Sequence, residues 1–411
     1  MASSLQDTIF SLPIVDTHTH IIQWQDVNQP FSALDFFNSS GCLRAFWTHA
    51  GALSRQEYRA FKRFDDWPSL SAAIDRIKAL AFYRMLLDGL RSLHDMDFVE
   101  LDEKSFLELS EKMKEAYRNP DWYRTVLRKK AGLETILQDS GSESDRSLFT
   151  RVARFDPYVW FGKPSWAERI IRKYGKERTS NLEDLVCCLR RDFTDAMDDG
   201  AASVKSNNCW GRTLEFLPTT EAEASDALAK CRKDPSDEKA VRTLGDYMMY
   251  QIAQLCAEHN IPLQIHTGPA GGIDHMVQYG NPLNLNTIIL HNPETKFVIF
   301  HAGGPFVSEC CSLASQFQNV YLDLCGVIAR GWLRRILDEW IEFVPLTKLM
   351  WGTDVNMVEE SYAIVRNFRQ VLSDFLDDRI KSGYLSCATA KEFARAVTAD
   401  NAKRILRLPN T

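Results

Sequence analysis

Short apolar runs alternate with longer segments of helical periodicity through most of the chain. Eight of these runs have the length and aliphatic character of buried strands, and they cover residues 12–18, 133–137, 151–155, 201–205, 262–266, 297–301, 320–324 and 346–352. Strands that alternate with helices are typical of parallel sheets with helical crossovers. Because eight parallel strands close a (β/α)8 barrel, the pattern predicts an α/β fold of the TIM-barrel class.

The segments between these runs carry apolar residues at i, i+3 and i+4, the spacing of an amphipathic helix. Helices of this kind are predicted over residues 237–258, 305–316, 330–343 and 357–379. Another is predicted from Ser180 to about Asp198, because Ser180-Asn-Leu-Glu183 has the form of a capping box. Each of these helices is expected to pack one face against the sheet.

One connection is much longer than the others. Residues 22–130 separate the first predicted strand from the second, and they contain strong helical patterns over 69–94 and 104–117. We interpret 22–130 as a large helical insertion after strand one, and about 207–235 as a smaller one after strand four. No Pro/Gly/Ser-rich linker divides the chain, so residues 1–411 are predicted to form one elaborated domain.

Composition narrows the class of protein. The chain is 45% hydrophobic and 25% charged, which is typical of a globular protein. Its 49 Lys and Arg against 55 Asp and Glu give a net charge of -6, which argues against nucleic acid as a partner. Ten cysteines without a C-x-x-C motif, no secretion signal pattern and no long apolar stretch indicate a cytoplasmic protein with no membrane partner.

Metal-binding residue types occur where predicted strands end. Five strands end in, or run into, such residues: His18 and His20, Lys205, His266, His301 and Asp354. In a closed parallel barrel these ends meet at one rim, and alternate strand residues such as His18 and His20 share a face. A lone strand-end histidine is more often structural, but imidazole nitrogens and a carboxylate together are typical zinc ligands. The ordered set therefore predicts a metal site at the rim.

The same motifs, in the same order, resemble the amidohydrolase superfamily. Within it they are similar to the amidohydrolase 2 branch, which includes nodulin-type domains and N-terminal domains of fungal developmental proteins. The matching segments are VDTHTH (15–20), ASVKS (202–206), PLQIHTG (262–268), FVIFHAGGP (297–305), VYLDL (320–324), KLMWGTD (348–354) and ADNAKRIL (399–406). The resemblance covers most of the chain except the 22–130 insertion.

The resemblance implies a catalytic metal, Zn²⁺ or alternatively Mn²⁺, with four protein ligands: His18, His20, His266 and Asp354. The His301 context resembles the single-metal branch, in which this histidine contacts the substrate. Binuclear members instead carry a carboxylated lysine, here Lys205, that bridges two ions, with His266 and His301 holding the second. One ion is the favoured interpretation, and two remain the alternative.

Two arginines are candidates for binding a substrate carboxylate. Arg212 follows Lys205 closely, and nodulin-type domains have a comparable arginine in this loop, while Arg330 follows strand seven. A guanidinium can hold a carboxylate bidentately, but both residues could equally form salt bridges at the rim. Some aromatic and histidine residues could also approach the site, although core or loop roles are commoner for them: Trp47, His49, Trp210 and Trp351.

The leading interpretation is a metal-dependent hydrolase acting on a small, carboxylate-bearing amide, lactone or ester-like substrate. Metal-bound hydroxide would attack the carbonyl, Asp354 would move the proton, and Lys205 and His301 would stabilise the oxyanion. Two other reactions are open on this scaffold: nonoxidative decarboxylation of an aromatic or unsaturated acid, and uronate-type isomerisation. A non-catalytic binding module is the third alternative, and the intact ligand set argues against it. The helical insertion also offers surface for a homo-oligomer.

Overall fold

Eight parallel strands form one sheet in the order of the sequence, as the pattern predicts. The computed structural model describes residues 5–41, 43, 56–57, 61–139, 145–269 and 275–408. Its strands are β1 (Ile14–Thr19), β2 (Leu133–Gln138), β3 (Thr150–Arg154), β4 (Ser203–Ser206), β5 (Leu263–Ile265), β6 (Phe297–Ile299), β7 (Val320–Asp323) and β8 (Leu349–Met350). The (β/α)8 fold is therefore confirmed, with strands shorter than several of the predicted runs.

The barrel closes between β1 and the segment that follows β8. The Thr17 N–H donates to the Trp351 carbonyl at 3.3 Å, and the Asp354 N–H donates to the His18 carbonyl at 2.9 Å. The His20 N–H then donates to the Val355 carbonyl at 2.8 Å. These backbone bonds place Asp354 directly beside the two histidines of β1.

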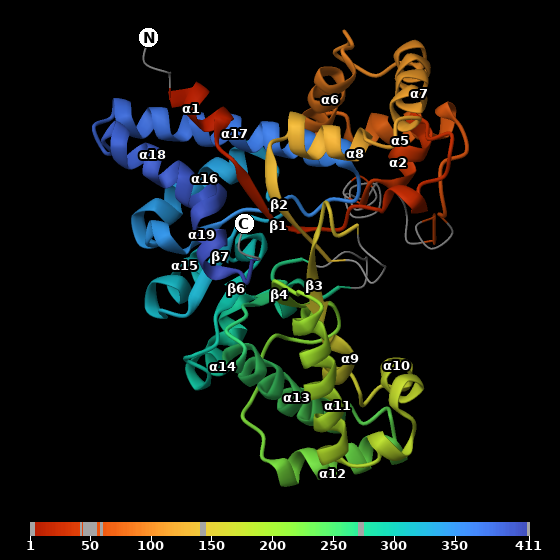
Figure 1. Cartoon of the computed structure of the whole chain (residues 1–411), viewed down its shortest axis with the longest axis vertical. Coiled ribbons are helices and arrows are strands. Elements are labelled where there is room, and N and C mark those ends of the chain that lie inside the picture. Colours follow the sequence, from red (N-terminus) through yellow and green to blue (C-terminus); the bar gives the residue numbers. More distant parts are fainter. Residues whose placement is uncertain are drawn as a thin grey trace.

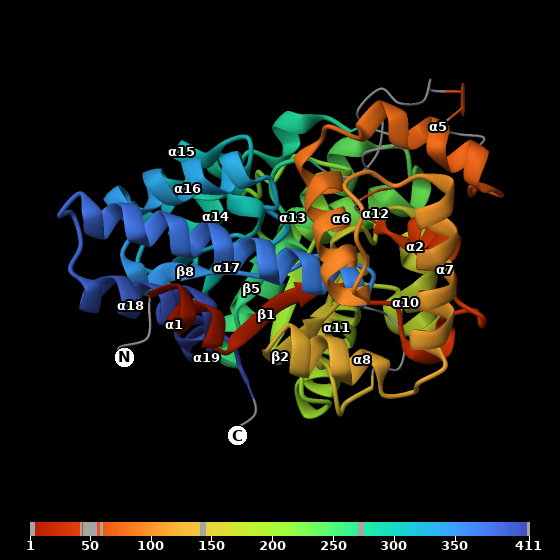
Figure 2. The same ribbon diagram turned by 90° about the horizontal axis from the view of Figure 1, so that it is seen from above.

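Helices surround the sheet (Figures 1 and 2). Those outside the β1–β2 connection are α1 (Leu5–Ser11), α9 (Asp156–Val159), α10 (Pro164–Tyr174), α11 (Leu182–Asp198), α12 (Glu221–Lys233), α13 (Glu238–Glu258), α14 (Asn286–His291), α15 (Val307–Gln316), α16 (Arg330–Phe343), α17 (Val358–Lys381), α18 (Cys387–Arg395) and α19 (Asn401–Ile405). Short 3-10 turns are η1 (Trp24–Asp26), η3 (Glu177–Thr179), η4 (Asn208–Trp210), η5 (Val277–Gly280), η6 (Pro282–Leu285), η7 (His301–Gly303) and η8 (Leu346–Lys348), and π-helical turns are η2 (Thr125–Lys130) and η9 (Ala396–Asp400). The helices predicted over 237–258, 305–316, 330–343 and 357–379 are confirmed.

Two predicted boundaries are wrong for local reasons. The cap of α11 is Asn181 and not Ser180: Asn181 has an extended backbone and accepts from the Asp184 N–H at 2.9 Å. Ser180 has a helical backbone as the residue that follows the 3-10 turn η3, so it does not have the extended backbone of an N-cap. The predicted strand 346–352 likewise begins with the 3-10 turn η8, which leaves only two residues in β8.

The described part of the connection between β1 and β2 is largely helical, as predicted. It contains α2 (Ala33–Ser39), α5 (Trp67–Ile77), α6 (Ala81–His94), α7 (Glu103–Tyr117) and α8 (Trp122–Arg124). The predicted helix 69–94 is two helices, because Leu80 has an extended backbone. This segment is held against α17 by Glu359, which accepts from the Tyr117 hydroxyl and from the Trp122 Nε1–H, both at 3.0 Å. Figure 2 shows α6 crossing next to α17.

The barrel interior is a filled apolar layer. We use this name for a set of buried residues from seven of the eight barrel positions, all except β5: Val15, Leu137, Val152, Ala202, Val298, Phe300, Cys325 and Met350. Below them pack Ala399 of η9, Ala402 and Ile405 of α19, and Leu406. The Arg407 N–H also donates to the Ala202 carbonyl at 3.0 Å. The N-terminal end of the barrel is thus covered, and the C-terminal end is left for a site.

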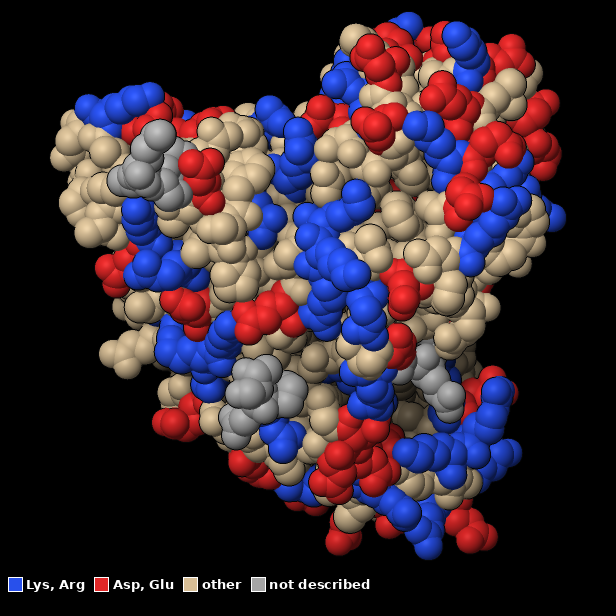
Figure 3. Space-filling view, turned by 45° about the horizontal axis from the view of Figure 1, so that its top comes forward, with Lys and Arg blue, Asp and Glu red and all other residues tan. Residues whose placement is uncertain are grey.

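The surface carries both signs of charge. On the face in Figure 3, Lys and Arg side chains form a band that runs down the centre, and Asp and Glu side chains gather at the upper right and near the lower end. In the part of the chain that the structure describes, no helix is both long and apolar enough to cross a bilayer.

Candidate metal centre

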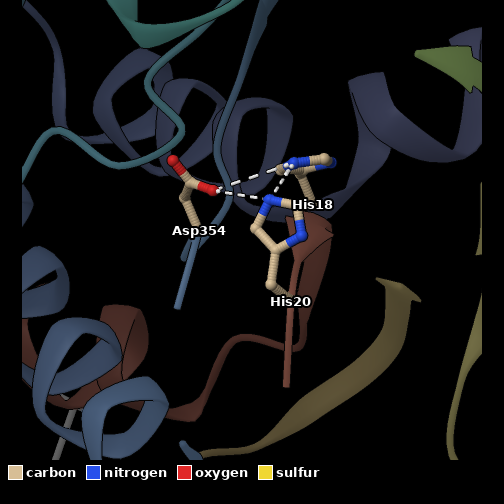
Figure 4. A group of neighbouring side chains, drawn as sticks. All are labelled: His18, His20 and Asp354. Atoms are coloured by element: carbon tan, nitrogen blue, oxygen red, sulfur yellow. Dashed lines mark hydrogen bonds and ion pairs between the residues drawn. The ribbon is translucent and has the colours of Figure 1, made fainter. Parts of the chain in front are cut away.

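Three predicted ligands converge at the C-terminal rim of the barrel. The His18 and His20 Nε2 atoms lie 3.2 Å apart, and Asp354 Oδ1 lies 3.7 Å from the former and 3.4 Å from the latter (Figure 4). Ligand atoms bound to tetrahedral zinc at about 2.0–2.1 Å lie roughly 3.3 Å from one another. The group therefore fits a divalent ion of this size without rearrangement. We call these three residues the metal centre.

The hydrogen bonding of His20 leaves the correct nitrogen free. Its Nδ1 lies 2.8 Å from the carbonyl oxygen of Asp139, just after β2, and can reach it only as an N–H donor. The lone pair is then on Nε2, which points at the other two ligands, as is usual for metal-bound histidine. The His18 Nδ1 is buried and has no hydrogen-bond partner among the described residues, so the polar partner of this ring must lie on its Nε2 side.

The ionisation states also suit a cation. Burial, together with the neighbouring Lys205 charge, holds the pKa of His18 well below its usual value, so the ring is neutral and able to bind a metal. Burial alone would raise the pKa of Asp354, but the His20 hydrogen bond and the nearby histidines hold it well below its usual range. Burial would also lower the pKa of His20, yet Asp354 raises it overall. Without metal, a proton between His20 and Asp354 occupies the position that a cation would replace.

Backbone strain concentrates at the same rim. Among the described residues, Asp354 has φ 57°, His301 has φ 61° and Ala302 has φ 53°. Non-glycine residues rarely adopt these left-handed values, and such strain persists where the surrounding structure requires it. The unusual backbone turns the Asp354 and His301 side chains back over the barrel mouth, toward each other: His301 Nδ1 and Asp354 Oδ2 lie 3.7 Å apart.

The remaining strand-end residues form the edge of the centre. His301 Nδ1 lies 2.8 Å from the Cys325 carbonyl, and its Nε2 lies 3.1 Å from His266 Nδ1. Burial lowers the pKa of His301 to about 4.

Lys205 Nζ lies 3.4 Å from His18 Nε2 and 4.3 Å above the Phe300 ring. His266 is thus beside His301, outside the compact His18, His20 and Asp354 group in which it was expected. A second group that could hold an ion consists of His301, Cys325 and Asp354.

The two arginines proposed for substrate binding both have partners within the protein. Arg212 is buried in an ion pair with Asp246 of α13, and it also donates to the Glu215 carbonyl at 2.8 Å. The structure favours the salt-bridge alternative for this residue, because the turn η4 directs its side chain toward α13. Arg330 is exposed at the start of α16, where its Nε donates to Asn367 Oδ1 at 2.7 Å. Trp351 is buried and stacks on Phe368. Trp47 and His49 lie outside the described residues.

Sequence reasoning missed two residues at this rim. Asp139 follows β2 and Arg154 ends β3; Arg154 Nε donates to Asp139 Oδ1 at 2.8 Å, and Asp139 Oδ2 lies 3.6 Å from His18 Nε2. Burial would raise the pKa of Asp139, but the Arg154 charge and hydrogen bond lower it overall. The rule that strand ends converge, applied to strands two and three as well, would have identified both.

Comparisons with known proteins agree with this architecture. Residues 210–408 match the family model described as Amidohydrolase (Amidohydro_2). The chain is 31% identical over 232 residues to Protein fluG of Emericella nidulans, a match that covers 52% of this chain and 27% of that protein. The chain therefore matches about a quarter of the length of this relative.

Solved structures of similar fold cover almost the whole chain. A uronate isomerase from Thermotoga maritima gives a TM-score of 0.80 at 17% identity, over 98% of this chain and 96% of that one. A glucuronate isomerase from Caulobacter crescentus gives 0.77 at 15% identity, over 98% and 92%. A candidate metal-dependent hydrolase from Lactobacillus casei ATCC 334 gives 0.70 at 19% identity, over 98% and 97%. These likenesses establish the fold, which serves metal-dependent hydrolases and isomerases. The match to the amidohydrolase 2 family model over residues 210–408 agrees with the resemblance of the sequence motifs to the amidohydrolase superfamily.

Proposed function

We propose that the protein is a metal-dependent hydrolase that cleaves a small amide, lactone or ester-like substrate at the C-terminal rim of the barrel. The observation that carries the proposal is the metal centre: two imidazole nitrogens and a carboxylate oxygen lie 3.2–3.7 Å from one another. A Zn²⁺ or Mn²⁺ ion held by His18, His20 and Asp354 would supply Lewis acidity toward a carbonyl oxygen and toward water.

Asp354 is placed to act as the proton carrier. Its Oδ1 faces His18 and His20, while its Oδ2 faces His301 at 3.7 Å. Because the carboxylate is ionised, Oδ2 can accept a proton from an attacking water and later return it to a leaving group. The strained backbone of Asp354 fixes this oxygen over the mouth of the barrel.

His301 and Lys205 are placed to stabilise negative charge. The Cys325 carbonyl fixes Nδ1 of His301, so Nε2 is the atom that can meet a substrate or exchange a hydrogen bond with His266. Lys205 Nζ is buried 3.4 Å from His18 Nε2, within reach of an oxygen bound at the centre. We favour one ion, because His18, His20 and Asp354 lie within 3.7 Å of one another and the second group, His301 with Cys325, also needs Asp354. Two ions with a carboxylated Lys205 are the alternative.

Metal analysis joined to an activity assay tests the proposal. The purified protein is expected to hold about one Zn²⁺ or Mn²⁺ per chain and to lose hydrolysis of a panel of amides, lactones and esters on chelation. His18→Ala is expected to lose both bound metal and activity. His291→Ala, which removes an exposed histidine of α14, is the matched control and should change neither. Full activity of chelated, metal-free protein would contradict the proposal.

A second candidate is isomerisation of a uronate. It is favoured by the likeness of the whole chain to two uronate isomerases, at TM-scores of 0.80 and 0.77. The experiment is to incubate the metal-loaded protein with glucuronate in deuterated water. Loss of the C2 proton signal would support isomerisation, whereas hydrolysis of the amide or lactone panel without such exchange would support the hydrolase.

A further inference from the structure

A cavity of about 510 Å³ lies between the ends of β3 and β4, beside the metal centre. Three tryptophans line it: Trp160 after α9, Trp166 of α10 and Trp210 of η4. Its polar lining consists of Arg154, Asp156, Lys163, Ser165, Asn207 and Glu238. Volumes of roughly 300–1,000 Å³ with aromatic walls are typical of small-molecule sites. The cavity is therefore large enough for one or two rings.

Two contacts connect this cavity to the metal centre. The Trp210 ring packs edge-on against the His266 ring, with centroids 5.8 Å apart. Arg154 binds Asp139, whose Oδ2 lies 3.6 Å from His18 Nε2. A substrate whose scissile bond is at the metal centre would thus extend toward the tryptophans.

The walls present aromatic surface that nothing else in the described chain covers fully. Trp210 is 51% exposed, although large aromatic side chains at such positions usually pack into the core. Gly211 keeps Trp160 close: a Cβ added at Gly211 would lie 3.0 Å from the edge of the Trp160 ring. The absence of a side chain at Gly211 sets the shape of this wall.

The charges around the cavity are already neutralised. Arg154 bonds Asp139 and also Asp156 at 3.1 Å, and the Asn207 amide, with its oxygen toward Arg154, accepts two further hydrogen bonds at 2.9 Å. Lys163 is paired with Glu238. Among the described lining residues, each cation therefore has a carboxylate partner, and a substrate carboxylate would gain little here.

We infer that this cavity binds the non-reacting part of the substrate, and that this part is a flat, uncharged aromatic group. The inference rests on the proposed function for the reaction, but the binding of the aromatic group does not depend on hydrolysis. The substrate inferred here differs from the carboxylate-bearing one expected from the sequence. Arg212 is already in a buried ion pair with Asp246, and Arg154 already binds Asp139 and Asp156, so neither is left to bind a substrate carboxylate. Flat rings stack on indole faces at little cost to polar groups.

Two amides with the same amide group and the same spacer test the inference: phenylacetamide, whose ring is flat and aromatic, and cyclohexylacetamide, whose ring is puckered and saturated. Binding is measured by calorimetry on the protein as isolated and after chelation. Phenylacetamide is expected to bind at least about fivefold more tightly in both states, and Trp210→Leu is expected to weaken it about tenfold. Gly211→Val, which fills the space against Trp160, should weaken phenylacetamide without removing a tryptophan. Phe343→Leu, an exposed change on α16, is the control.

The outcomes separate this inference from the proposed function. If neither amide is hydrolysed but the binding preference appears and is lost in Trp210→Leu, the cavity assignment holds and the hydrolase proposal fails for amides. If both amides are hydrolysed with equal kcat/KM and bind equally, the aromatic assignment is overturned while the hydrolase proposal stands. Unchanged binding in both Trp210→Leu and Gly211→Val, with normal thermal unfolding, would also overturn it.

Discussion

The two ends of the same eight strands are built from opposite kinds of residue. The apolar layer lies toward the N-terminal end and is closed below by η9 and α19, although its members Phe300 and Cys325 follow the C-terminal ends of β6 and β7. The C-terminal part holds buried or partly buried ionisable groups, among them His18, Lys205, Asp139 and Asp354. Phe300 marks the border, since its ring lies 5.0 Å from the His18 ring and 4.3 Å from Lys205 Nζ.

This difference separates stability from chemistry. Burial of apolar side chains stabilises a fold, whereas buried charges cost free energy unless they are paired or bind a cation. A cluster of such groups at one end of a barrel is therefore typical of a functional site rather than of a stabilising core. Substitutions at the two ends should consequently affect different measurements.

The largest expected effect is at the closed end. Ile405→Ala, in the helix that covers the apolar layer, should lower the free energy of unfolding by about 2–5 kcal/mol, because it leaves a cavity under the barrel. Chemical denaturation with fluorescence detection measures this. The matched control is Leu290→Ala on the exposed side of α14, which should change stability by less than about 0.5 kcal/mol. Loss of metal from folded Ile405→Ala protein would break the proposed separation.

The next largest expected effect is a pH dependence of stability that comes from a buried carboxylate away from the metal centre. Glu360 is buried near the start of α17, and burial raises its pKa from 4.5 to about 7. The folded state therefore keeps a proton that the unfolded state releases as pH rises from about 4.5 to 7, so stability should fall across this window and level off above it. Denaturation of wild type and Glu360→Gln between pH 4.5 and 8 checks this. The free-energy difference between them should change by up to about 3 kcal/mol; a constant difference would contradict it.

The smallest effect concerns the support of the metal centre. Arg154→Met should release the Asp139 side chain from its hydrogen bonds to Arg154. Because the Asp139 backbone carbonyl accepts the hydrogen bond of His20 Nδ1, this change should weaken the affinity of the metal centre for its ion about 10–100-fold. Arg151→Met is a close control, because Arg151 lies on the same strand but pairs with the surface residue Asp199. Metal titration by competition with a chelator distinguishes them. Equal metal affinities of Arg154→Met and Arg151→Met would show that Arg154 does not support the metal centre.

Much of the fold and part of the site could be predicted from the sequence. The eight strands follow from local apolar runs, and barrel closure brings His18, His20 and Asp354 to one rim whatever the details of the loops. Strand lengths could not be predicted as well, since the 3-10 turn η8 replaces the first half of the predicted eighth strand. The split of 69–94 at Leu80 likewise depends on one backbone conformation within an unbroken apolar pattern.

The sequence by itself determined the barrel, its helical insertion and the residue types at the strand ends, because periodicity and strand-end spacing are local properties of the chain. Only the tertiary structure decided which side chains the strand-end residues contact. It placed His266 against His301, buried Arg212 with Asp246, and joined Asp139 to Arg154. The physical reason is that the turn after each strand sets the direction of its side chain. Left-handed residues such as His301 and Asp354 adopt that turn only when the neighbouring strands hold them there.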